Sequence, residues 1–203
     1  MKATGGKTRA MSDYRGLIGS LCILSGVLAT GMGSFHFLLG QEGRLLQGIR
    51  FYWEWMGVLA FILLCGGCMW WRLVRLTGKA FWPEGSRRSI VAFLAPMVAG
   101  GIVSYELVSG YDEFELCALC WVMCYGAALV SIRQIAPVSL PLPSGWKFLF
   151  IGALVTFFWR SYGAAFAPQL GVGELEAGAA IMILCFGILH LVQGAVLLLT
   201  QGK

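Results

Sequence analysis

Charged side chains are scarce in this chain. They make up only 12% of the 203 residues, whereas 58% of the residues are hydrophobic. A soluble domain of ordinary composition carries about 25% charged residues to cover its surface. This shortage excludes a water-soluble globular protein and points to one that is solvated mainly by lipid.

The apolar residues form long runs instead. A helix needs about 20 apolar residues to span a hydrocarbon core about 30 Å thick. The connections between the runs are too short to bury a core of their own. We therefore expect an all-α fold, a bundle of six transmembrane helices forming one integral membrane domain over residues 1–203. The expected spans are 17–39, 53–73, 89–109, 115–133, 146–162 and 175–200.

Positive charge is unevenly distributed between the two sides that these spans define. Twelve of the 15 basic residues fall on the side of the two termini, and only Arg44, Arg50 and Arg160 fall on the other. Cytoplasmic loops hold the excess of Lys and Arg. The sequence predicts that both termini are cytoplasmic and that the protein is a multi-pass protein of a bacterial inner membrane. The net charge of +5 is then a matter of topology and gives no reason to expect nucleic-acid binding.

Motifs of the common catalytic classes are missing. The chain has no nucleophile-elbow serine, no phosphate-binding loop and no pair of histidines at metal-binding spacing. No metal site is expected, because the two Cys-x-x-Cys pairs, at 65–68 and 117–120, lie at different depths in the membrane.

Cys117 and Cys120 form a Cys-x-x-Cys pair at the start of the fourth span. A helix amino terminus stabilises a thiolate there. In motif and depth this pair resembles the membrane thiol oxidoreductases of the DsbB and vitamin K epoxide reductase kind. That resemblance implies electron transfer from the two thiols to a quinone. The expected outer loops, near 40–52, 110–115 and 162–174, contain no cysteine for the shuttle pair of those families. Structural packing of the seven cysteines is the alternative.

His36 and His190, the only histidines, share a local pattern. Each has a glycine three residues before it and another four residues after it, namely Gly33 and Gly40, and Gly187 and Gly194. These glycines lie on the same helical face as the imidazole. They would leave room for a flat haem or chlorin with histidine as its axial ligand. The alternative is that each histidine bonds a neighbouring helix and that the glycines permit close packing.

Three ionisable residues lie at the outer membrane boundary: Glu54, Glu106 and Arg160. Charged groups at that depth are usually paired, because desolvation without a partner costs several kcal/mol. We predict a structural ion pair between Arg160 and at least one of the two glutamates. The alternative is that each side chain extends separately into the headgroups.

A second resemblance covers roughly residues 90–200. The stretch from Cys120 to Ser131, with Trp121, Tyr125 and Gly126, is similar to one found in a group of small bacterial multi-pass membrane proteins, and Gly152 and the Gly187–His190–Gly194 helix match further features. That group has no assigned activity. The resemblance therefore implies a fold and a location only.

These observations favour a non-enzymatic accessory or scaffold subunit of a membrane complex. Its expected partners are the lipid bilayer and either other membrane proteins or further copies of this chain. Two alternatives remain open: a quinone-linked thiol oxidoreductase using Cys117 and Cys120, and a haem- or chlorin-carrying subunit using His36 and His190. The sequence assigns no cofactor.

Overall fold

The structure of the protein is a computed structural model that describes residues 3–41, 48–78, 84–135, 145–163, 169 and 171–200. Regular secondary structure within these ranges is helical throughout, which confirms the expected all-α class. The elements are α1 (Ala3–Gln41), α2 (Gly48–Thr77), α3 (Glu84–Tyr111), α4 (Phe114–Ile135), α5 (Gly145–Phe158) with the π-helical turn η1 (Trp159–Gly163), and α7 (Glu174–Met182) continuing through the π-helix η3 (Ile183–Ile188) into α8 (Leu189–Leu199).

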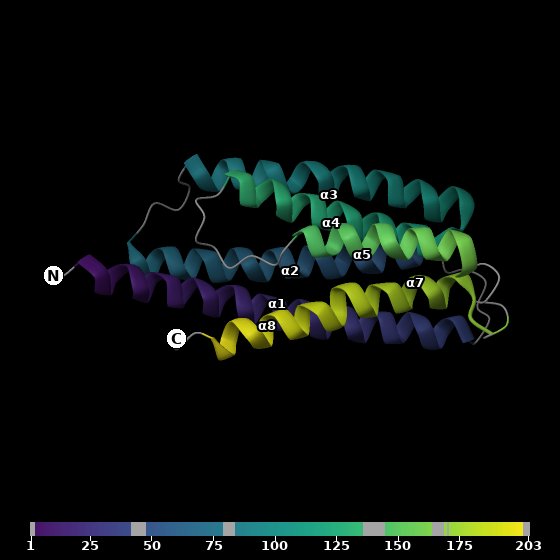
Figure 1. Ribbon diagram of the computed structural model, residues 1–203, viewed down its shortest axis with the longest axis horizontal. Helices are drawn as coiled ribbons and strands as arrows, with labels where there is room; N and C mark the ends of the chain where they lie inside the picture. The colour runs from purple at the N-terminus through teal and green to yellow at the C-terminus, as the bar shows by residue number, and fades with distance from the viewer. Residues whose placement is uncertain are drawn as a thin grey trace.

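The helices lie side by side as antiparallel rods along the long axis of the molecule (Figure 1). Both termini lie at the same end. At this end a hydrogen bond joins α1 to the residue that follows α8: Arg15 Nη1 donates to the carbonyl oxygen of Thr200 over 3.3 Å. The end with the termini is called the near end below, and the opposite end, where α1 finishes and α2 begins, is called the far end.

Five of the described helical segments are long and apolar enough to cross a membrane. They are Arg15–Leu38, Ile49–Leu76, Arg87–Tyr111, Phe114–Gln134 and Glu174–Leu199. Each coincides with a span expected from the sequence to within a few residues. The remaining expected span, 146–162, corresponds to α5 and η1, which are shorter.

Helix α4 lies at the centre of the bundle. Half of its spanning segment is buried, against only 6% for α2. Glycines allow close approach on three sides of α4. A Cβ atom on Gly100 of α3 would lie 2.8 Å from Cys124, one on Gly126 of α4 would lie 2.9 Å from the carbonyl oxygen of Gly145 in α5, and one on Gly178 of α7 would lie 2.8 Å from the carbonyl oxygen of Phe114. Since lipid tails compete equally for apolar side chains, such close contacts favour helix association in a membrane.

Helix α1 and the last rod, α7 to α8, meet along a seam of glycines spaced seven residues apart. Gly19, Gly26 and Gly33 lie on α1, opposite Gly194 and Gly187 of the last rod. A Cβ atom on Gly26 would lie 2.8 Å from the Gly187 carbonyl oxygen, and one on Gly33 would lie 3.2 Å from that of Ala179. The backbones therefore approach closely from Gly19 to Gly33 of α1. This seam joins the beginning of the chain to its end.

Candidate functional site

A polar cluster joins α1 to α2 at the far end. Glu54 of α2 is its centre: Arg50 Nε donates to Glu54 Oε1 over 2.7 Å, and His36 Nε2 lies 3.1 Å from Glu54 Oε2. The His36 contact is close but lacks hydrogen-bond alignment. His36 is only 2% exposed, whereas Glu54 is 24% exposed and Arg50 is 58% exposed. The cluster therefore runs from the buried interface between the helices to the surface.

Aromatic rings enclose His36. The ring of Phe51 stands edge-on to the imidazole with centroids 4.8 Å apart, and Trp55 stacks on it at 6.4 Å. Phe51 and Trp55 lie on either side of Glu54 along α2 and are both buried. The arrangement holds the imidazole against one carboxylate and leaves it facing α2.

A second polar contact joins α4 to α8 in the bundle interior. The Tyr125 hydroxyl lies 2.9 Å from His190 Nε2. Phe93, Phe148 and Phe186 pack edge-on against the Tyr125 ring, with centroids 5.0 to 6.3 Å away. His190 is 5% exposed and is the second residue after the π-helix η3, at whose end the amide of Leu189 bonds to the carbonyl of Leu184 five residues earlier. A π-helical turn shifts the residues that follow it around the helix axis, and it places His190 toward α4.

Side chains of the bundle fill the space beside three of the four glycines near these histidines, and the haem or chlorin interpretation stays a prediction. The space beside Gly33 is filled by Ile183, that beside Gly187 by Thr30, and that beside Gly194 by Ile23. An axial ligand also needs a free ring nitrogen pointing at the metal. Nε2 of each histidine instead faces a protein partner, Glu54 or Tyr125. The glycines at three of the four positions serve helix packing.

Three thiols of α4 lie on the face packed against α3. Cys117 is 1% exposed and faces Ser104, which is itself fully buried. The Cys120 thiol donates to the carbonyl oxygen of Gly100 over 3.8 Å and also contacts Cys124. All seven cysteines are free thiols. The redox interpretation of Cys117 and Cys120 stays a prediction.

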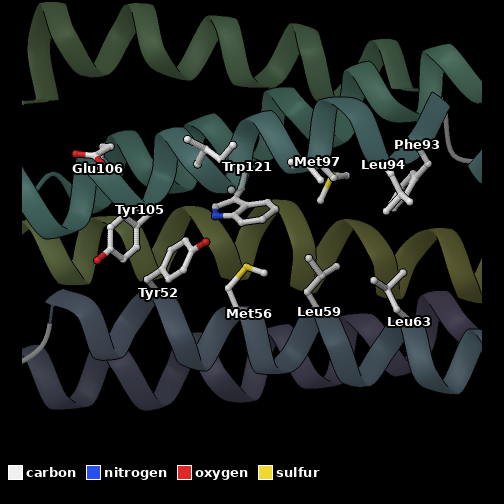
Figure 2. A pocket seen from close by; sticks show the side chains of 13 residues that line it. Tyr52, Met56, Leu59, Leu63, Phe93, Leu94, Met97, Tyr105, Glu106 and Trp121 are labelled. Atoms are coloured by element: carbon white, nitrogen blue, oxygen red, sulfur yellow. The ribbon is translucent and has the colours of Figure 1, made fainter. Parts of the chain in front are cut away.

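An open groove runs between α2 and α3, with a volume of about 460 Å³ (Figure 2). Trp121 of α4 projects into it between the two helices, as the figure shows. Tyr52, Tyr105 and Glu106 lie at its far end, while Leu63, Phe93 and Leu94 lie toward the middle of the bundle. The groove thus has a polar end and an apolar end.

The three charged residues singled out in the sequence take different positions. Glu54 belongs to the cluster with His36 and Arg50. Glu106 is exposed at the polar end of the groove. The side chain of Arg160 lies outside the described residues, so its predicted contact with either glutamate stays a prediction. The ion pair between Arg50 and Glu54 was not predicted from the sequence, although a spacing of four residues is typical of a helical ion pair.

No described group of three or more His, Cys, Asp or Glu residues is arranged to hold a metal ion.

Comparison of the chain with protein families, curated proteins and solved structures found no match. The function is therefore argued from the geometry alone. The class of protein that the fold defines is an all-helical, multi-pass membrane protein.

Proposed function

We propose that this protein is a non-enzymatic accessory or scaffold subunit of a membrane complex. The main support comes from two glycines on α2 that have open space beside them where a side chain would be. Gly57 and Gly67 are exposed, and a Cβ atom on either would meet nothing within 4 Å. Glycine in a helix interior costs about 0.5–1 kcal/mol relative to alanine. In membrane helices it recurs where a second helix approaches closely.

Other glycines of the same chain show how glycine is used where a second helix is present. Gly26, Gly33, Gly126 and Gly187 each lie against a neighbouring helix of the bundle. By the same physical argument, the outward face of α2 is suited to a helix from another protein or another copy. This face includes Gly57, Ala60, Leu64 and Gly67, which lie within a broad strip of one helix side.

The internal polar groups also support a structural role. His36 and Glu54 join α1 to α2, and Tyr125 and His190 join α4 to α8. Each of these groups is directed at a protein partner instead of into the groove. Interhelical polar contacts of this kind stabilise and align membrane helices.

Photo-crosslinking tests the proposal in intact membranes. A photoreactive amino acid at Leu64, on the outward face of α2, is expected to give a discrete protein adduct, either with another protein or with a second copy. The matched control is Phe150 of α5, which is 69% exposed against 65% for Leu64. The substitution Gly57→Ile should reduce the Leu64 adduct several-fold, because the branched side chain holds a second helix away. Lipid adducts alone at Leu64, or an adduct that Gly57→Ile leaves unchanged, would contradict the proposal.

The proposal includes orientation: six spans in a bacterial inner membrane with both termini in the cytoplasm. Two observations support it: Arg15 of α1 and Thr200 meet at one end of the bundle, and the sequence assigns 12 of the 15 basic residues to the side of the termini. A reporter that works only in the cytoplasm should then be active when it is fused after Lys203, and one that works only in the periplasm should be inactive there. Activity of a periplasmic reporter at the same fusion point would overturn the orientation.

A second candidate is a thiol–quinone oxidoreductase built on Cys117 and Cys120. It is favoured by the position of Cys120, which bonds to Gly100 while the next residue, Gly101, lines the groove. In that reaction the two thiols would become a disulfide, and a quinone would take up the two electrons and two protons to become a quinol. Counting free thiols before and after quinone addition separates the candidates: a scaffold retains all seven, and an oxidoreductase loses two.

A further inference from the structure

The groove between α2 and α3 has the dimensions of one lipid chain in one leaflet. Its lining on α2 runs from Tyr52 to Leu63, which is about 16 Å at 1.5 Å per residue. Half of a hydrocarbon core about 30 Å thick is about 15 Å. The side chains along this length are almost all apolar, as Met56, Leu59 and Met97 show in Figure 2.

The polar end of the groove is suited to a positively charged or hydrogen-bond-donating headgroup. Glu106 is the one charged residue among the described residues that line the groove, and at the same end the Tyr52 and Tyr105 rings pack edge-on against each other with centroids 5.5 Å apart. None of the described residues that line the groove is basic. Arg50, at the same end of α2, is bonded to Glu54. A carboxylate attracts an ammonium group and repels an anionic headgroup.

Trp121 closes the groove on the side of the bundle core. Its ring lies against Gly101, where a Cβ atom would be 3.7 Å from both the Trp121 ring and the Tyr52 hydroxyl. Trp121 is 7% exposed and so forms a fixed wall. The groove is open on the opposite side, toward the lipid, and a chain can enter it laterally.

We propose that this groove is a binding site for one membrane lipid of the far-end leaflet, an aminophospholipid whose ammonium group lies at Glu106 and one of whose chains lies along α2. The lipid occupies the side of α2 that carries Leu59 and Leu63. The proposed protein partner of α2 approaches the side that carries Leu64. The two proposals can therefore fail separately.

Native mass spectrometry of the purified full chain tests the site. The probes are phosphatidylethanolamine and phosphatidylglycerol with the same acyl chains, added separately in detergent. We expect one tightly retained phosphatidylethanolamine per chain and weaker retention of phosphatidylglycerol. Glu106→Gln should reduce this preference about fivefold, as loss of an exposed ion pair worth about 1 kcal/mol predicts. The control Glu174→Gln changes an exposed carboxylate outside the groove and should leave the preference unchanged.

A second pair of variants tests the chain-binding part of the groove. Leu63→Trp fills the groove and should abolish retention of the lipid. Leu64→Trp adds the same ring to the neighbouring, non-lining position and should have no effect. Leu59→Trp replaces Leu63→Trp if that variant does not insert, since Leu59 lines the same groove one turn nearer its polar end. Equal retention of the two lipids by the unmodified chain, or equal retention by the Leu63 and Leu64 variants, would overturn the proposal.

Discussion

The substitution Gly26→Ile is expected to lower the free energy of unfolding by about 3 kcal/mol, the upper part of the range for overpacked cores. A Cβ atom on Gly26 would lie 2.6 Å from Leu191 Cγ and 2.8 Å from both the Gly187 carbonyl oxygen and the Leu191 amide nitrogen. Two of these atoms belong to the backbone and cannot rotate away. The two rods would have to separate along the glycine seam, with loss of the contacts on either side.

Gly31→Ile supplies the matched control on the same helix. A Cβ atom on Gly31 would meet nothing within 4 Å, and the change in helix propensity is the same. Thermal unfolding of both variants in detergent measures the difference. A loss of 3 kcal/mol corresponds to roughly 6–12 °C in Tm for a chain of this size. Equal unfolding temperatures for the two variants would show that the seam does not hold the rods together.

The second large effect concerns the contact between Tyr125 and His190. Either Tyr125→Phe or His190→Phe leaves a buried polar atom without its partner, and each should cost about 1–2 kcal/mol. The double variant, with both partners apolar, should cost less than the sum of the two. This non-additivity is the property of a direct pair that a double-mutant cycle measures.

Tyr111→Phe is the control for loss of a phenol hydroxyl. Tyr111 is 73% exposed, so its replacement should change the unfolding free energy by no more than about 0.5 kcal/mol. Steric trapping or thermal unfolding in detergent gives the four values of the cycle. Strictly additive costs for the two single substitutions would mean that Tyr125 and His190 do not interact energetically.

The helices themselves were largely predictable. Apolar runs of about 20 residues, separated by charged segments, are sufficient to locate helices that can cross a bilayer. The run at 146–162 was the exception: its α-helical part ends at Phe158, where the π-helical turn η1 follows, and the segment is not among the described helices long and apolar enough to cross a membrane. Nothing in the local sequence distinguishes a π-helical turn from an α-helical one. The turn depends on how the chain packs.

The roles of the candidate residues were harder to predict. The glycines around His36 and His190 had two interpretations, room for a flat ligand or room for a helix, and the spacing is the same for both. The choice depends on what lies opposite, which is Ile183 at Gly33 and Thr30 at Gly187. Similarly, the sequence offers Arg50 as a partner of Glu54, because the two lie four residues apart on one helix. The contact of Glu54 with His36 depends on how α1 and α2 are aligned side by side, which the sequence does not show.

What the sequence by itself determined was that this chain folds in lipid as apolar helices, with a strong bias of basic residues toward one side. The reason is local: in hydrocarbon every backbone amide must bond within its own segment, and a run of about 20 apolar residues has no other favourable conformation. Only the tertiary structure decided which helix faces which. All the spans are similarly apolar, so their pairing depends on the fit of small residues such as Gly26 against Gly187 and on single polar contacts such as Tyr125 with His190, residues 65 positions apart.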